Sequence, residues 1–161
     1  MLNNYLPFTK SKKLLNIDKN AKTVKGQKYG YLTAILYLAS SNLSGFNVCP
    51  QASLGCKKAC LVSSGHGAFK NVLEGRINKT RWFIQERETF LTQLRREIKN
   101  FISYAYKKNL TPCIRLNGTS DIAWETFGIM EEFSNIQFYD YTKIYKRALK
   151  FINGQLPSNY H

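Results

Sequence analysis

The sequence predicts an α/β fold built from parallel strand–helix repeats. Apolar runs of strand length alternate with longer segments whose apolar residues recur every three or four positions. This alternation is typical of parallel sheets, in which helices connect successive strands. The chain has 161 residues, of which 43% are hydrophobic. That is enough for one core of ordinary size, so we expect a single α/β domain over residues 30–161.

Residues 1–29 are expected to form a basic, loosely ordered N-terminal arm. Lysines at seven positions accompany a single acidic residue, Asp18. A stretch with so much charge of one sign offers little to a hydrophobic core. The arm is therefore interpreted either as a phosphate-tracking segment or as a solvated basic surface.

The elements of the domain follow in order. Residues 31–39 are aromatic and aliphatic, start after Gly30 and predict a buried strand. Residues 68–108 have helical periodicity, which Gly75 or the stretch 87–89 could divide into two helices. The later expected elements are strand 111–117, helix 122–133 with Ser120 or Asp121 as N-cap, strand 136–141, and helix 143–152 closed by Asn153-Gly154.

Charge and cysteine content bear on partners and compartment. The 24 Lys and Arg against 10 Asp and Glu give a net charge of +14. Such a field attracts polyanions, so nucleic acid or a phosphorylated small molecule is the expected partner. No apolar run reaches the roughly 20 residues of a membrane span, and no signal peptide is evident. A cytoplasmic protein keeps its thiols reduced, which favours metal binding or catalysis over disulfides.

Three of the four cysteines lie in one turn-rich loop, as Cys49, Cys56 and Cys60 with the spacing C-x6-C-x3-C. We predict that they bind a metal. Zinc with His66 as a fourth ligand is one interpretation, although structural zinc sites usually contain paired CxxC motifs. Three thiolates can also hold a four-iron cluster with one iron left open. The alternatives are a redox pair or small packed residues, and Cys113 is interpreted as a buried strand residue.

Polar side chains concentrate after the second and third expected strands. In parallel sheets, working groups stand at the carboxyl ends of strands. A capped turn, with Asp121 serving the next helix and pairing with Arg115, is the competing interpretation. The predicted catalytic residues are Asp121, Asp140 and Lys143, and the predicted cofactor-binding residues are Arg115, Asn117, Gly118 and Thr119.

Several separated motifs together resemble the phage gene-product-88 family. They are residues 20–26, 31–39, 44–50, 55–61, 79–83, 115–121 and 138–143. The resemblance implies an origin in a phage, prophage or plasmid, and hence the host cytoplasm. Family members continue past Asn159–His161 with strand-like segments, which implies that this chain is C-terminally shortened. An eight-unit barrel needs about 200 residues or more, so we expect a partial, TIM-barrel-like half barrel.

A related three-cysteine phage group has radical-SAM-like character, and this analogy extends the cluster interpretation. Radical S-adenosylmethionine enzymes space their cysteines C-x3-C-x2-C, which differs from the spacing here. The resulting prediction is a protein with a 4Fe-4S cluster and S-adenosylmethionine that acts on nucleic acid or nucleotides. The alternative is a non-enzymatic, zinc-braced nucleic-acid-binding protein of phage replication or host takeover. The oligomeric state stays open.

Overall fold

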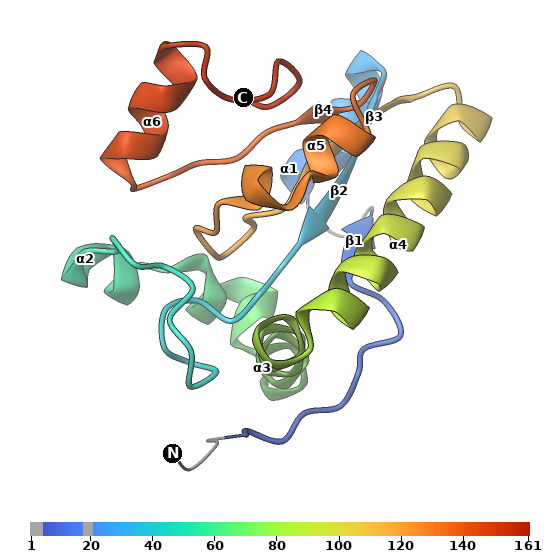
Figure 1. Cartoon of the computed structure of the whole chain (residues 1–161). Helices are drawn as coiled ribbons and strands as arrows, with labels where there is room; N and C mark the ends of the chain where they lie inside the picture. The colour runs from blue at the N-terminus through green and yellow to red at the C-terminus, as the bar shows by residue number, and fades with distance from the viewer. Residues whose placement is uncertain (1–4, 18–20) are drawn as a thin grey trace.

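The computed structural model describes residues 5–17 and 21–161, and within them it forms a four-stranded sheet ordered β1-β2-β3-β4. The strands are β1 (Leu15–Ile17), β2 (Tyr31–Leu36), β3 (Thr111–Arg115) and β4 (Gln137–Phe138). β1 runs antiparallel to β2, whereas β2, β3 and β4 are parallel (Figure 1). The predicted α/β class with mostly parallel strands is confirmed.

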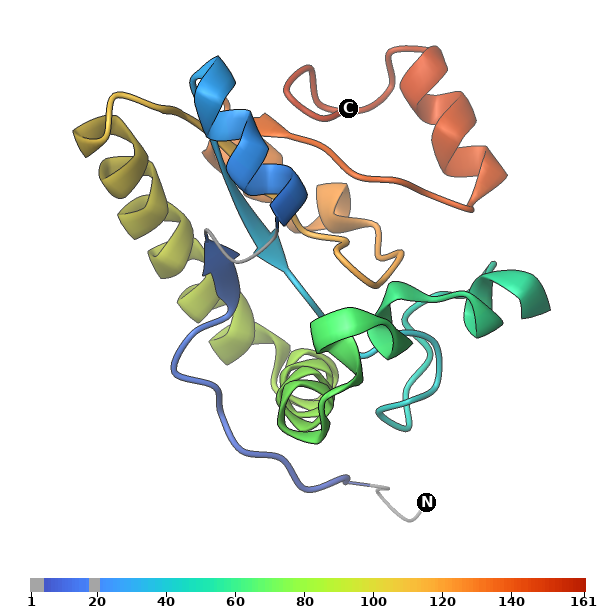
Figure 2. The same cartoon turned by 180° about the vertical axis from the view of Figure 1, so that it is seen from behind.

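Short helices and two long ones connect the strands. In Figure 2, the segment of α1 and η1 lies in front of the sheet, and α5 lies on the opposite side in Figure 1. The helices are α1 (Ala21–Val24), η1 (Lys25–Tyr29), α2 (Leu54–Lys58), η2 (Leu61–Ser63), η3 (Gly65–Ala68), α3 (Lys70–Gln85), α4 (Arg87–Lys107), η4 (Trp124–Phe127), α5 (Ile129–Glu132) and α6 (Tyr145–Ile152). Among the described residues, none of these helices has the length and apolar composition needed to cross a membrane.

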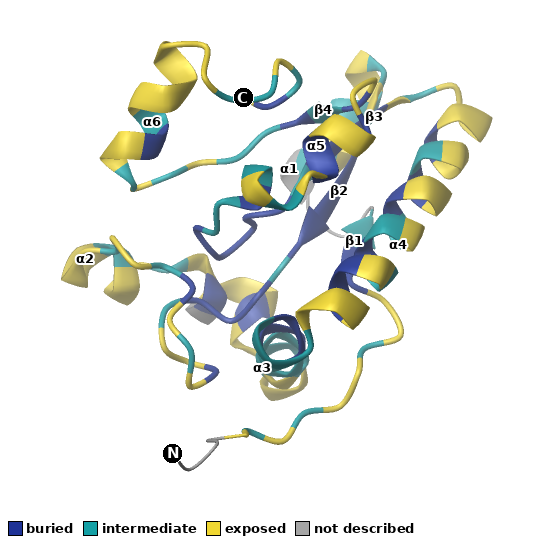
Figure 3. Ribbon diagram, in the orientation of Figure 1, coloured by how far each residue is buried: buried dark blue, intermediate teal, exposed yellow. Residues whose placement is uncertain are grey.

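The long crossover from β2 to β3 divides at Glu86, next to the predicted boundary at 87–89. Glu86 leaves helical geometry, with φ −131° and ψ 57°, and its amide still closes α3 by donating to the Trp82 carbonyl at 2.8 Å. Gly75 stays inside α3. The apolar stripe of α4 faces the core, as the dark inner face of the helix shows in Figure 3. Its buried members are Phe90, Leu91, Leu94, Ile98, Phe101 and Ala105.

The expected single helix over 122–133 is wrong. A 3-10 turn, η4, and the short α5 replace it, because Gly128 between them adopts φ 67° in the left-handed region. The predicted N-cap role of Asp121 is also wrong, since its carboxylate bonds to Thr142 and to the Lys143 amide instead. The end of α6 agrees with the sequence, where Asn153 caps the helix and Gly154 has φ 65°.

The last residues add a strand-like pairing beside β4. Phe138 donates its amide hydrogen to the Asn159 carbonyl at 2.8 Å, and His161 donates to the Phe138 carbonyl at 3.1 Å. Asp140 completes the pattern by donating to the His161 carbonyl at 2.9 Å. The chain therefore returns to the sheet after α6 and lies parallel to β4.

Part of the expected N-terminal arm packs against the domain. Leu14 and Leu15 are buried, and Glu97 on α4 accepts both of their amide hydrogens at 2.9 Å. The buried Lys79 ammonium donates to the Leu14 carbonyl at 2.8 Å. Residues 5–17 thus contribute more to the core than their composition indicates, because two leucines and backbone groups make the contacts. Residues 1–4 and 18–20 of the expected arm lie outside the described residues.

Candidate functional site

The loops after β2, β3 and β4 meet at one end of the sheet (Figure 1). Asp121, after β3, donates its amide hydrogen to the Val48 carbonyl after β2 at 2.8 Å. Its carboxylate accepts the Lys143 amide hydrogen after β4 at 2.7 Å. Parallel strands place their carboxyl ends together, and the three polar loops are therefore in direct contact.

The cysteine loop contains three half-buried thiols that form no disulfide, Cys49, Cys56 and Cys60. Cys56 lies on α2, where the Ser53 hydroxyl accepts its amide hydrogen at 3.1 Å and caps the helix. The Cys49 thiol contacts the Thr119 carbonyl at 3.8 Å, which ties the loop to the segment after β3. Cys113 also forms no disulfide and is buried in β3.

Cys49 lies in an unfavourable environment for a thiolate. Burial raises the pKa of Cys49, and the negative charges of Cys60, Asp121 and Cys56 raise it further. A cation placed among these groups would favour their deprotonated form. Three soft sulfur donors in one loop suit zinc or an iron–sulfur cluster. Among the described residues, however, no three His, Cys, Asp or Glu side chains already stand in a metal-binding arrangement, so binding requires the loop to rearrange.

Asp140 is buried at the centre of a hydrogen-bond network. Its carboxylate accepts the backbone amide hydrogen of Asn117 at 2.7 Å and the Tyr160 hydroxyl hydrogen at 2.9 Å. Burial raises the pKa of Asp140 to about 6, although the bonds from Asn117 and Tyr160 and the charges of Arg115 and Arg147 oppose this increase. A carboxyl group with such a pKa can exchange a proton near neutral pH.

Asp121 belongs to a second, connected group around Arg147 of α6. Arg147 pairs with Asp121 at 3.0 Å and contacts both carboxylate oxygens of Glu125 at 2.7 and 2.8 Å. Arg147 also donates to the Tyr160 hydroxyl, which in turn donates to Asp140. The two predicted catalytic carboxylates are thus linked through Arg147 and Tyr160. Sequence reasoning missed both connecting residues, because neither stands near a carboxylate in the chain.

The predicted cofactor-binding residues after β3 make internal contacts. The Asn117 side chain accepts from Ser120, Trp124 and the Ile122 amide, and it donates to the Ile122 carbonyl. A Cβ on Gly118 would lie 2.6 Å from the Leu36 carbonyl oxygen, so glycine allows the loop to pack on β2. Thr119 donates its hydroxyl hydrogen to the Leu38 carbonyl at 2.5 Å.

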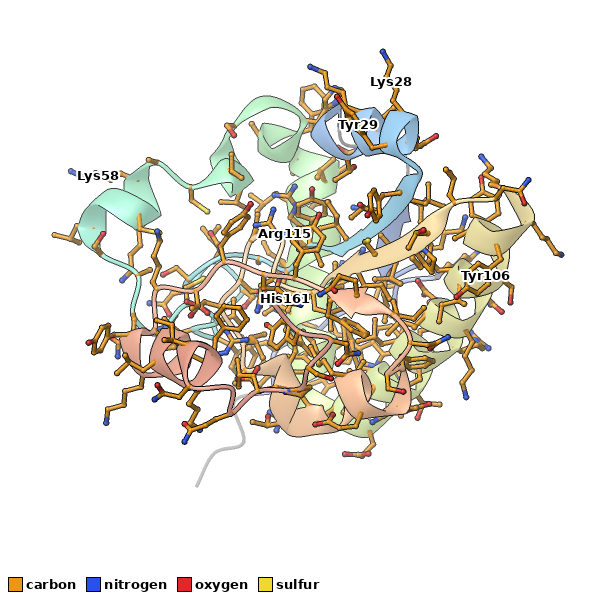
Figure 4. All side chains as sticks on the ribbon, turned by 90° about the horizontal axis from the view of Figure 1, so that it is seen from above. Lys28, Tyr29, Lys58, Tyr106, Arg115 and His161 are labelled. Atoms are coloured by element: carbon orange, nitrogen blue, oxygen red, sulfur yellow. The ribbon has the colours of Figure 1, made fainter. Side chains whose placement is uncertain are left out.

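Arg115 and Lys143 are the predicted site residues with the least internal pairing. The Arg115 guanidinium lies 4.8 Å from the Tyr141 ring centroid, and Figure 4 shows it near the centre of the view from above. Its Nε is 4.0 Å from Asp140, and among the described residues this buried atom has no hydrogen-bond partner. The Lys143 side chain is exposed, and only its backbone amide contacts Asp121.

A cavity of about 820 Å³ adjoins the cysteine loop, and sequence reasoning did not identify it. Tyr37 after β2, Arg76 on α3 and His66 of η3 contribute to its walls. Leu61, which directly follows Cys60, also lines it. The one available signal was the polar and basic character of α3 on the side where Gly75 and Arg76 lie.

Comparison with known proteins gives a single family. A family model described as gene product 88 matches residues 9–161, which is nearly the whole chain. No curated protein and no solved structure shows a significant match.

Proposed function

Because the chain belongs to the gene product 88 family, we propose that it is a phage-type protein that binds an iron–sulfur cluster through Cys49, Cys56 and Cys60. We further propose that it acts as a radical-SAM-like enzyme on nucleic acid or nucleotides. One observation carries the proposal: three half-buried thiols, none of them in a disulfide, lie in one loop after β2.

The order of the strands supports the enzyme part of the proposal. β2, β3, β4 and the pairing at Asn159–His161 follow one another across the sheet in chain order. Strands have the same consecutive, parallel order in a (β/α)8 barrel, whose functional groups stand at the carboxyl ends. A half barrel with its site in the loops after the strands is therefore the architecture that we propose.

The residues of the chain divide into three roles in this proposal. The cysteines hold the cluster, and the exposed Lys57 and Lys58 of α2 offset its negative charge. When bound, a cluster with three thiolate ligands supplies an open iron for a cofactor such as S-adenosylmethionine. Asp140, with a pKa of about 6, takes up or releases a proton, and Arg115 would contact an anionic group.

The remaining predicted site residues shape the loops. Asn117, Gly118 and Thr119 fix the segment after β3, and Asp121 joins it to α6 through Arg147. Lys143 extends from this scaffold toward solvent. The +14 charge supports a nucleic acid or phosphorylated partner, and membership of a phage family supports the cytoplasm of the host cell as the compartment.

Metal analysis after anaerobic purification and reconstitution tests the proposal. We expect about four iron and four sulfide per chain. Cys49→Ala, Cys56→Ala and Cys60→Ala should each lose most of the iron. Cys113→Ala is the matched control, because Cys113 is free but buried in β3, and it should retain iron.

Two outcomes contradict the cluster. A colourless protein without iron after reconstitution removes the enzyme proposal. Stoichiometric zinc without iron, lost in the same three variants, replaces it with the zinc-braced nucleic-acid-binding protein.

A further inference from the structure

The cavity beside the cysteine loop has the size of a small-molecule site. Its volume of about 820 Å³ lies within the roughly 300–1,000 Å³ of typical ligand pockets. Most of its lining comes from three segments, which are the end of β2, residues 71–79 of α3 and the loop of η2 and η3. Ser11, Asn16 of β1 and Thr119 complete the lining. The three segments lie close together in both Figure 1 and Figure 2. The cavity is therefore a built part of the fold and not a surface irregularity.

The polar lining of this cavity is cationic. Arg76, Lys79 and His66 all contribute to its wall, whereas no Asp or Glu of the described residues does so. The Lys79 ammonium donates to the Leu14 carbonyl at 2.8 Å, which fixes its position. A concave site with cations and without carboxylates attracts an anion.

The guanidinium of Arg76 stacks on an aromatic ring but leaves one buried nitrogen without a hydrogen bond among the described residues. Its guanidinium stacks 4.9 Å from the Tyr37 ring centroid, an arrangement that holds the planar group in place. Its Nη1 is buried, and within the described part of the chain it has no hydrogen-bond partner. Burial also lowers the pKa of Arg76, because a charged group there is poorly solvated. A buried N–H of a guanidinium without an acceptor is unfavourable unless a ligand supplies one.

The other buried arginine shows how this chain normally satisfies such a group. Arg147 contacts the carboxylates of Asp121 and Glu125 and the hydroxyl of Tyr160. Arg76, by contrast, forms no ion pair with any carboxylate among residues 5–17 and 21–161. It differs from Arg147 in facing an open cavity. An anionic ligand in this cavity could therefore supply the negative charge that pairs with Arg76.

We propose that this cavity binds the phosphate group of a phosphorylated small molecule, with Arg76 as its principal contact. The planar fork of an arginine presents two donors to phosphate oxygens. Lys79 adds positive charge on the same wall, and a wall with two cations suits a doubly charged phosphate monoester better than a single carboxylate. A volume of about 820 Å³ suits a small molecule, whereas a nucleic-acid strand needs an extended groove.

This inference rests on the proposed function, because it assigns a binding site to the phosphorylated partner proposed there. Phosphate binding at this site does not require a bound metal. Leu61 lines the cavity and directly follows Cys60, so a bound phosphate ester would lie beside the cysteine loop. Phosphate binding should persist in the triple variant Cys49→Ala, Cys56→Ala, Cys60→Ala. Loss of metal with retained phosphate binding then separates failure of the cluster proposal from failure of this one.

Calorimetric titration of the full chain with pyrophosphate, AMP and adenosine tests the site at about 50 mM salt, where charge–charge attraction is weakly screened. We expect pyrophosphate and AMP to bind, and adenosine to bind at least about 10-fold more weakly, because it lacks the charged group. Arg76→Met keeps the unbranched apolar stem of the side chain and removes the charged guanidinium, and it should weaken AMP binding by about 10- to 100-fold.

Arg96→Met is the matched control, because it removes the same charge from an exposed position on α4. It should change AMP affinity less than about 2-fold. The melting temperature of ligand-free Arg76→Met should stay the same or rise, since an unsatisfied buried cation is removed. If it falls, Arg76→Lys keeps the charge and serves instead, with partial loss of affinity expected.

Three results overturn the proposal. The first is that neither pyrophosphate nor AMP binds at millimolar concentration. The second is that adenosine binds as tightly as AMP. The third is that Arg76→Met and Arg96→Met weaken AMP binding equally. Binding of an oligonucleotide that depends on Arg76, without any binding of AMP, would also overturn it and assign the cavity to nucleic acid.

Discussion

Arg147 of α6 forms a 3.0 Å ion pair with Asp121 of the loop after β3, and both side chains are more than 90% buried. The same guanidinium contacts Glu125 and Tyr160. Through this pair, the last helix is fixed to the loop that also contacts the cysteine segment, by way of Asp121 and Val48. The pair therefore holds together the end of the sheet at which the candidate site lies.

Arg147→Met should destabilise the protein by about 3–5 kcal/mol. It leaves the carboxylates of Asp121 and Glu125 buried without a cation, which costs more than the pair contributed. Urea unfolding at neutral pH measures the change. Lys150→Met on the same helix is the control, because Lys150 is exposed, and it should shift stability by less than about 0.5 kcal/mol. If both variants change the free energy of unfolding equally, the buried Arg147–Asp121 pair does not stabilise the fold more than an exposed lysine does.

Asp140 should make stability depend on pH. Its folded pKa of about 6 lies above its ordinary value of 3.8, so the folded state binds the proton more tightly. The resulting stabilisation is complete below about pH 4 and disappears as the pH rises through 6, a loss of about 3 kcal/mol.

Unfolding in urea between pH 4 and 7 checks this dependence. Asp140→Asn does not titrate, so its unfolding free energy should fall less steeply with pH than that of the wild type. The difference between the two curves isolates Asp140 from the other titrating groups. Parallel curves over this range would show that Asp140 keeps an ordinary pKa in the fold.

Gly118→Ala should destabilise the fold by about 1–3 kcal/mol. The new Cβ would lie 2.6 Å from the Leu36 carbonyl oxygen and 2.8 Å from Cγ2 of Ile35, so the loop after β3 must move off β2. Gly75→Ala is a matched control with nothing within 4 Å of the new Cβ, and in the middle of α3 it should stabilise by about 0.5–1 kcal/mol. Thermal unfolding of both variants gives opposite signs if this packing is correct.

Nucleic acid, if it is the partner, should bind through the positive charge near the cysteine loop. Affinity for a short single strand should fall steeply between 50 and 200 mM salt, because bound counterions are released. Lys57→Gln with Lys58→Gln should reduce the slope of log affinity against log salt by about 1 to 2. Fluorescence anisotropy measures it.

The control for that prediction lies across the molecule. Figure 4 places Lys58 and Tyr106 at opposite sides, and Lys107 directly follows Tyr106 on α4. Lys107→Gln should leave the salt slope unchanged. If the lysine changes on α2 and Lys107→Gln alter the slope of log affinity against log salt equally, the strand is attracted by net charge alone. If no single strand binds at low salt, nucleic acid is excluded as the partner.

Local patterns were sufficient for the main elements of the fold. The apolar runs at β2 and β3 and the helical spacing in α3 and α4 identified the strand–helix alternation, because periodicity reports which face of an element is buried. Prediction from local patterns failed at residues 122–133. There Gly128 turns the backbone, and Asp121 pairs with the distant Arg147 and does not cap a helix. The conformational preferences of neighbouring residues do not show that Asp121 will pair with an arginine 26 positions away.

The sequence by itself determined that three thiols would share one loop and that polar strand ends would lie beside it, since parallel strands align their carboxyl ends. Only the tertiary structure decided the partners of these groups. Arg147 reaches Asp121 across 26 positions, and Arg76 faces a cavity lined by several segments that are far apart in the sequence. Ion pairs and cavities depend on distances between elements, which packing sets and which spacing along the chain does not encode.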